Sequence, residues 1–318
     1  MTKTISPAQT PTAELAGALP ERVRIKRGIR WGRVAAWCAM GLLLFVSLFP
    51  FFWMIRTALS TNSDLVTGSQ SLVPDNPTML NLRQALGLAS TAELEKAGTL
   101  TSADVNFFTA LRNSVIVCTL ITIGQLTFCA MAAYAFARLK FPGRDKLFFL
   151  FLTAMMIPPI FTLIPNFVLI KNLGWLNTFP GIVAPFFLMT PFAVFFLRQF
   201  FLGISREVEE AALLDGAGRW KIFRQLIIPM SAAPLATLAV LTYITAWHEY
   251  MWPLVTGDSE GVRVLTVALN AFKSSTPTDA PPWAPLMAGT FLASLPLIVL
   301  FLAMARRMVD AIGFSGIK

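Results

Sequence analysis

Six long apolar runs, separated by shorter polar segments, dominate the hydrophobic pattern of the chain. Each run is close to the roughly 20 residues that a helix needs to cross about 30 Å of hydrocarbon. The runs are Val34–Ile55, Asn113–Ala137, Leu147–Ile170, Phe179–Leu197, Met230–Val255 and Leu286–Ala305. Nearly all charged residues lie between them. The pattern therefore predicts an all-α membrane protein with six transmembrane helices.

The composition agrees with this class. Of 318 residues, 55% are hydrophobic and only 14% are charged, and the mean hydropathy is +0.64. A soluble domain must cover its surface with polar groups, whereas a membrane protein exposes apolar side chains to lipid. Cys38, Cys118 and Cys129 all lie inside predicted spans. Neither a disulfide framework nor a metal site is therefore expected.

The net charge of +9 first suggests a nucleic-acid partner, but the distribution of the charges argues against one. Of the 26 Lys and Arg residues, 19 lie before the first span, in 138–146, in 198–230 or after residue 305. Basic flanks stay in the cytoplasm, so both termini and the 198–230 loop are predicted to be cytoplasmic. The basic residues are then a topology signal in the cell membrane, next to lipid, and no nucleic-acid partner is expected.

The order of these segments predicts four parts. They are a largely disordered cytoplasmic tail (1–33), the first transmembrane helix with a long outer loop (34–107), a five-helix transmembrane domain (108–308) and a cytoplasmic tail (309–318). A cleaved signal peptide is the alternative for the first span. Its apolar core is too long and runs into Pro50, Phe51 and Phe52 without a small-residue cleavage pattern, which indicates a retained anchor.

The most unusual polar segment is EVEEAALLDGAGRW at 207–220, which lies between two predicted spans. Ser205 can cap a helix whose first turns are acidic. Asp215 and Gly216 should end that helix, because glycine reaches conformations that cost other residues free energy. A second, amphipathic helix is predicted from Trp220 to Ile228, with Trp220, Phe223, Leu226 and Ile227 on one side, before Pro229. The segment is predicted to be two short helices joined by a turn.

This segment resembles the EAA loop of permease subunits in binding-protein-dependent ABC importers. The match is carried by Glu210-Ala211-Ala212, Gly216, Leu226 and Ile228-Pro229, at 202–230 between two spans. Further segments resemble the carbohydrate (MalG-like) branch of that family: DGA at 215–217, LFPFFWM at 48–54, Asn113-Ser114, AAYAFARLKFPGRD at 132–145, WHEYMWPL at 247–254 and the ending GFSGIK. The resemblance covers about residues 34–318.

The resemblance implies the type I ABC importer permease (MetI-like) fold and a set of partners. These are a second homologous permease, two ATPase subunits and an extracytoplasmic solute-binding protein, for which the 256–285 loop is the expected contact. It also implies that the EAA loop couples to the ATPase through Glu210, Ala211, Ala212, Asp215 and Gly216. The chain has no GxxxxGK[ST] sequence, so ATP and magnesium are expected on the partner, with no cofactor and no enzymatic activity on this chain.

Ionisable and aromatic residues near the outer end of the fifth span are the second candidate site. Trp247, His248, Glu249 and Tyr250 could line the outer mouth of a sugar pathway, or could form an interfacial belt with Glu249 reaching headgroup water. Gln125 could line the pathway or hold two helices together. An ion-coupled secondary transporter is the alternative function, although buried charges are few, and a membrane scaffold without solute flux is a third.

Overall fold

The computed structural model describes residues 31–66, 71–97, 105–274 and 282–313, and these residues form helices and loops only. The chain divides into two units, residues 1–50 and 51–318, and each is described by itself. In the first unit, the described part is the beginning of helix α1 (Trp31–Ala58), whose side chains up to residue 50 are all exposed. An exposed apolar helix of this kind suits lipid contact. Most of the expected N-terminal tail lies outside the described residues.

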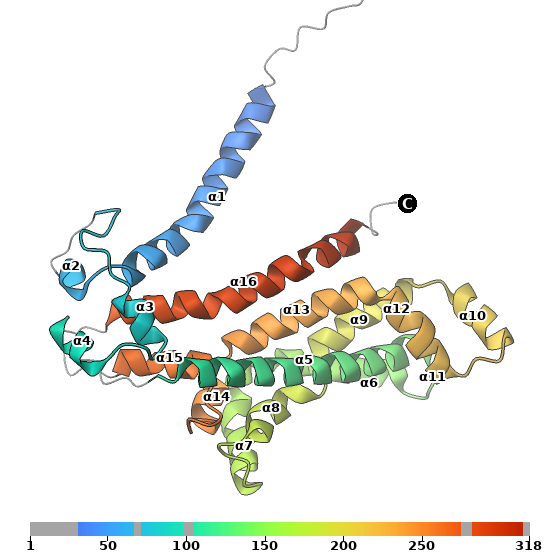
Figure 1. Ribbon diagram of the computed structural model, residues 1–318. Helices are drawn as coiled ribbons and strands as arrows, with labels where there is room; N and C mark the ends of the chain where they lie inside the picture. Colours follow the sequence, from blue (N-terminus) through green and yellow to red (C-terminus); the bar gives the residue numbers. More distant parts are fainter. Residues whose placement is uncertain (1–30, 67–70, 98–104, 275–281, 314–318) are drawn as a thin grey trace, which may run out of the picture. The chain divides into compact units, whose positions relative to one another are not determined.

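Three helices are long and apolar enough to span a membrane: α1, α5 (Phe107–Arg138) and α16 (Trp283–Gly313), the last through Met304. Three bent pairs pass the same criterion together: Arg144–Met156 with α7 (Pro159–Asn172), α8 (Phe179–Phe187) with α9 (Pro191–Gly203), and Arg219–Met230 with α13 (Ala232–His248). The prediction of six spans is confirmed if each bent pair is counted as one. Figure 1 shows α5, α9 and α13 running alongside one another in the second unit.

The third, fourth and fifth spans are not continuous helices. The third bends by 97° after α6 (Arg144–Thr153) and a 3-10 turn, where Pro158 and Pro159 follow one another. The fourth bends by 45° just before Pro191. The fifth bends by 77° at Ser231, between Met230 and Ala232, and is interrupted again at Glu249, between α13 and α14 (Met251–Thr256). Proline removes a backbone donor and keeps the preceding residue out of the helical region, which explains the first two breaks.

Helix α5 is the centre of the second unit. It contributes buried side chains to all three apolar clusters, and it packs against α8, α9, α13 and α15 (Leu265–Ser274). Gly124 allows α8 to come close, since a Cβ at this position would lie 2.4 Å from the carbonyl oxygen of Phe187. The small residues of α5 thus let the neighbouring helices pack tightly around it.

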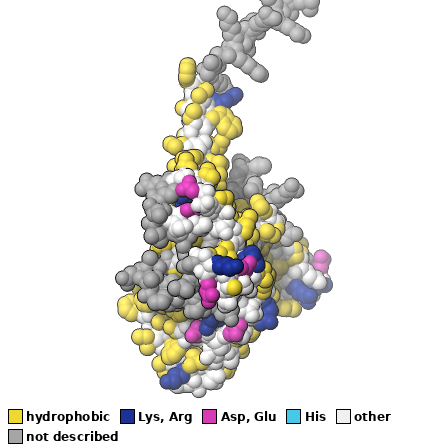
Figure 2. All heavy atoms as spheres, turned by 60° about the vertical axis from the view of Figure 1, so that its left-hand side comes forward, with side chains coloured by type: hydrophobic (Ala, Val, Ile, Leu, Met, Phe, Trp, Pro, Cys, Tyr) yellow, Lys and Arg dark blue, Asp and Glu magenta, His cyan; other side chains and the backbone are white. Residues whose placement is uncertain are grey.

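The predicted outer loops contain helices of their own. In the first loop these are α2 (Asn62–Val66), α3 (Leu80–Ala85) and α4 (Thr91–Lys96), of which α3 packs against α16. In the second loop, α15 packs against α5 and α16 with Leu265 and Phe272 buried. Figure 2 brings this end forward and shows charged side chains gathered on it.

Two polar residues attach the second loop to α5. Asn113 is fully buried and its Nδ2 donates to the carbonyl oxygens of Gly261 (3.0 Å) and Arg263 (3.1 Å). The hydroxyl of Ser114 accepts the backbone N–H of Leu265 at 2.7 Å. These bonds satisfy backbone groups that the loop would otherwise leave unpaired. At the other end of the chain, α16 continues to Gly313, so the expected tail at 309–318 begins as helix.

Candidate functional site

The first half of the EAA loop (residues 202–230) folds as predicted. Helix α10 (Arg206–Leu214) begins at Ser205, whose Oγ accepts the N–H of Glu207 at 3.2 Å. It ends at Gly216, which has φ +78°. The N–H of Gly216 donates to the carbonyl of Leu213 (3.0 Å), and that of Ala217 donates to the carbonyl of Ala212 (2.9 Å). This is the Schellman arrangement, in which glycine takes the left-handed position.

The residues expected to meet the ATPase differ in exposure. Glu210, Ala211, Asp215 and Gly216 are exposed, whereas Ala212 is half-buried against the core of the second unit. The two alanines therefore do not form one external face, because consecutive residues of a helix point in different directions. Leu214, at the end of α10, is 90% exposed and adds an apolar side chain to the outer surface.

Glu209 is the acid of this segment that faces inward. Its Oε1 lies 2.8 Å from Nε of Arg138, the last residue of α5, and both side chains are more than 90% buried. The acids of α10 therefore do not all face outward, because Glu209 points toward α5. Glu207 and Glu210 remain exposed.

The second half of the EAA loop is not one regular amphipathic helix. It consists of α11 (Arg219–Ile222), a π-helical turn (Phe223–Ile227) and α12 (Ile228–Met230). The N–H of Ile228 donates to the carbonyl of Phe223, five residues back, just before Pro229, which has no N–H. Ile222 and Phe223 are buried, whereas Trp220 is 60% exposed, although its ring lies 5.4 Å from that of Phe223, on the same side as predicted.

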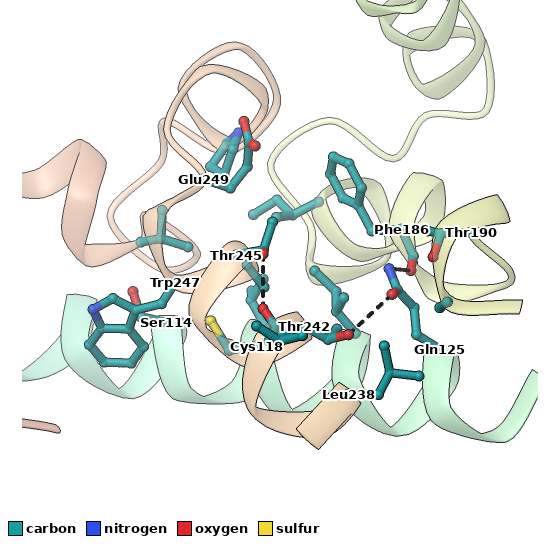
Figure 3. Close-up of a pocket in the computed structure, with 18 of the residues that line it drawn as sticks. Ser114, Cys118, Gln125, Phe186, Thr190, Leu238, Thr242, Thr245, Trp247 and Glu249 are labelled. Atoms are coloured by element: carbon teal, nitrogen blue, oxygen red, sulfur yellow. Dashed lines mark hydrogen bonds between the residues drawn. The ribbon is translucent and has the colours of Figure 1, made fainter. Parts of the chain in front are cut away.

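A cavity of about 220 Å³ lies between α5, α8 and α13 (Figure 3). Its walls are mainly apolar, and its polar lining residues are Ser114, Gln125, Thr190, Thr242, Thr245 and Glu249. Gln125 lies between two helices: its Nε2 donates to the carbonyl of Phe186 at 2.9 Å, and its Oε1 accepts the Thr242 hydroxyl at 3.5 Å. Gln125 therefore joins three helices, one of the two functions considered for it, and it also lines the cavity.

The four residues expected at the outer mouth are separated by the break after α13. Trp247 and Glu249 line the cavity, and Glu249 Oε1 also accepts the N–H of Trp252 at the start of α14. His248 is exposed and its Nδ1 contacts the carbonyl oxygen of Ile244 at 2.8 Å. Tyr250 packs against another apolar cluster. His248 and Tyr250 are not among the residues that line this cavity.

Sequence reasoning missed two residue sets that organise these sites. In the sequence, Arg138 stands out only as part of the AAYAFARLKFPGRD segment at 132–145, and nothing marks Thr242 or Thr245 as site residues. Each threonine has neighbours that are apolar, so the sequence marks it only as a small polar interruption of a span. Among the described residues, no group of three or more His, Cys, Asp or Glu side chains could hold a metal ion.

Comparisons with known proteins identify relatives of the whole chain. The family described as "Binding-protein-dependent transport system inner membrane component" matches residues 125–312. The chain is 30% identical over 300 residues to the "Probable ABC transporter permease protein YurM" of Bacillus subtilis, covering 93% of each chain. It is 28% identical to the "Trehalose/maltose transport system permease protein MalG" of Thermococcus litoralis, covering 87% of this chain and 94% of the relative.

A solved structure has the same fold. It belongs to a bacterial ABC transporter involved in the import of the acidic polysaccharide alginate, and the superposition has a TM-score of 0.71 at 22% sequence identity. The match covers 91% of this chain and 99% of the solved chain. The all-α permease fold expected from the spans and the EAA loop is therefore confirmed.

Proposed function

Because the chain belongs to the family of binding-protein-dependent transport system inner membrane components, and is thus a permease subunit of an ABC importer, we propose that its solute is a sugar or a related polyol. Relatives named for diacetylchitobiose, arabinooligosaccharides, trehalose or maltose, and sn-glycerol-3-phosphate support this class. The alternative of an ion-coupled secondary transporter has no support among these relatives.

The work of transport comes from other subunits in this proposal. The chain lacks a GxxxxGK[ST] phosphate-binding sequence, so ATP and magnesium would bind to two separate ATPase subunits. A second, similar permease completes the pathway, and an external binding protein delivers the solute. The positive-inside distribution supports cytoplasmic termini and a cytoplasmic EAA loop, where the ATPase can reach it.

The observation that carries the coupling role is the geometry of the EAA loop. Helix α10 has a capped start, a sharp end at Gly216 and an outer surface that includes Glu210, Ala211 and Leu214. A solvated connection between two spans does not need a helix with both ends fixed. A short, rigid helix with an acidic and apolar outer surface suits a cleft on another protein.

Reconstitution of the complex tests this function. The chain is placed in liposomes with a candidate partner permease and a candidate ATPase, and a candidate binding protein is added with its sugar. We expect the loaded binding protein to stimulate ATP hydrolysis and to drive uptake without an ion gradient. Uptake that depends on an ion gradient and continues with a hydrolysis-deficient ATPase would support the secondary transporter, and no flux under any condition would support a scaffold.

The cavity between α5, α8 and α13 is the proposed contribution of this chain to the pathway. Its mixture of apolar surface and a few hydroxyl and amide groups is typical of small-molecule sites. Glu249 and Thr245 lie on its wall and Gln125 lies deeper between the helices (Figure 3).

Filling this cavity should block the pathway without stopping the ATPase. We expect Thr245→Trp to lower uptake by at least about tenfold, because the indole occupies space that the solute needs. Thr290→Trp is the matched control: Thr290 is also an exposed helical threonine that bonds to the carbonyl four residues back, but it does not line the cavity. Uptake of radiolabelled sugar and ATP hydrolysis are measured together. Normal uptake by Thr245→Trp would remove the cavity from the pathway.

A further inference from the structure

Two side chains on one face of α5 hold the two halves of the EAA loop. Tyr134 and Arg138 are four residues apart, so they lie one above the other on the helix. Arg138 contacts Glu209 of α10, and the ring of Tyr134 lies 5.1 Å from that of Phe223, at the start of the π-helical turn. The loop is therefore attached to the last two turns of α5, at one point in each.

Arg138 joins three helices. Besides the ion pair with Glu209, its Nη2 donates to the carbonyl oxygen of Phe201 and, at 2.5 Å, to that of Ile204. These carbonyls belong to the end of α9, where a helix presents its negative dipole. One buried guanidinium thus holds the end of α9 and the carboxylate of α10 at the same time. The contact with Glu209 has the distance of an ion pair without the alignment of a hydrogen bond.

Burial makes this link hard to break during movement. The side chains of Arg138 and Glu209 are 3% and 7% exposed. Separating them would leave two unpaired charges away from water, which is far more costly than separating a surface pair. The exposed pair Arg83 and Glu93, 2.7 Å apart with side chains 49% and 40% exposed, can exchange its contacts for water.

We propose that Arg138 is a positioning residue that makes α10 move with α5 and α9 as one body. Movement imposed on α10 would then pass directly to α5, the helix that lines the cavity with Ser114 and Gln125. This inference rests on the proposed coupling role of the EAA loop. It adds that Arg138 transmits the movement of α10 and that α5 is the helix that receives it.

Replacing both charges by apolar side chains tests the link without leaving an unpaired charge. The double variant Arg138→Met with Glu209→Met should insert and assemble, because apolar residues of similar size often replace a buried ion pair without loss of stability. We expect its basal ATP hydrolysis to persist while uptake per ATP hydrolysed falls by at least about tenfold. Arg83→Met with Glu93→Met is the matched control and should keep the ratio of the unmodified complex.

A distance measurement on the otherwise unmodified interface gives a second test. Spin labels are placed at Glu207, exposed in α10, and at Ile123, exposed in α5, after Cys38, Cys118 and Cys129 are replaced by alanine. In the complete complex, the distance should stay the same with and without trapped ATP. In the double methionine variant, the distribution of distances between the two labels should broaden or shift. A shift of several ångströms with Arg138 and Glu209 in place would overturn the inference.

The two proposals fail in different ways. If the unmodified complex shows no uptake stimulated by its ATPase, the proposed function is wrong. If the unmodified complex transports and the assembled double methionine variant transports with the same uptake per ATP, only the role of Arg138 is wrong.

Discussion

Uptake should fall to the level of a complex without ATPase when Glu210 is replaced by lysine. Glu210 is exposed on α10 beside Ala211, so reversing its charge changes the outer surface of the EAA loop and leaves the core of the chain intact. If an ATPase cleft with basic side chains receives this surface, Glu210 faces those cations. A lysine at the same position would face them with a like charge, and like charges in an interface cost several kcal/mol. We expect a loss of at least about tenfold in solute uptake by proteoliposomes.

The same change from glutamate to lysine, made outside the EAA loop, provides the control. Glu95 is an exposed glutamate in the short helix α4, and Glu95→Lys should leave uptake close to normal. Co-purification of the ATPase separates lost docking from lost transmission, and Glu210→Lys should lower it. Full uptake by a correctly inserted Glu210→Lys protein would contradict docking of the ATPase at Glu210.

Gly216→Val should also abolish most uptake, for a different reason. A Cβ at Gly216 would have no atom within 4 Å, so the substitution is not sterically blocked by neighbours. The φ of +78° is the obstacle, since left-handed backbone costs an L-residue about 1–2 kcal/mol and is worse for a β-branched one. The turn would relax, and α10 would point in another direction relative to α11.

Two controls isolate the backbone effect on uptake. Gly216→Asn adds a side chain that tolerates the left-handed region, so most of the uptake should remain. Gly203→Val adds the same valine at a glycine that also has open space around it but has no positive φ. If Gly216→Val transports as well as Gly216→Asn, the angle between α10 and α11 does not matter for coupling.

The sequence predicted the number of spans and the positions of the loops, but not the shape of the spans. Hydropathy over 147–170 is the same for a straight helix as for α6 and α7 with 97° between them. Pro158 and Pro159 interrupt the helical hydrogen bonds, but the angle of the bend depends on how the freed backbone groups find partners. The break at Glu249 has no proline before it and was not predicted.

The sequence also predicted the start and the turn of the EAA loop, because both depend on local residues. Ser205 caps α10, and Gly216 has the positive φ expected of the residue that ends this helix. The orientation of Glu209 depends instead on Arg138, 71 residues earlier in the chain. A run of neighbouring acids contains no information on which one meets a distant arginine, so that contact required the structure.

The outer-mouth prediction shows the same limit. Trp247 to Tyr250 are consecutive and are aromatic or ionisable, so the sequence predicts that they form one group. In the structure, Trp247 ends up stacked on Tyr243, while His248 is exposed and Glu249 caps α14. Only the packing of three separate helices decides which of these side chains reaches the cavity.

The bonds of Asn113 to the 261–263 backbone give α5 a mechanical property. Asn113 and Arg138 are the attachment points at its two ends, and the 25 residues from one to the other span about 37 Å along an unbroken helix without proline. A tilt of about 5° about the Asn113 end displaces the Arg138 end, and the loop attached to it, by roughly 3 Å. The helix then works as a lever arm, turning a small angular change at Asn113 into a displacement of the EAA loop at Arg138.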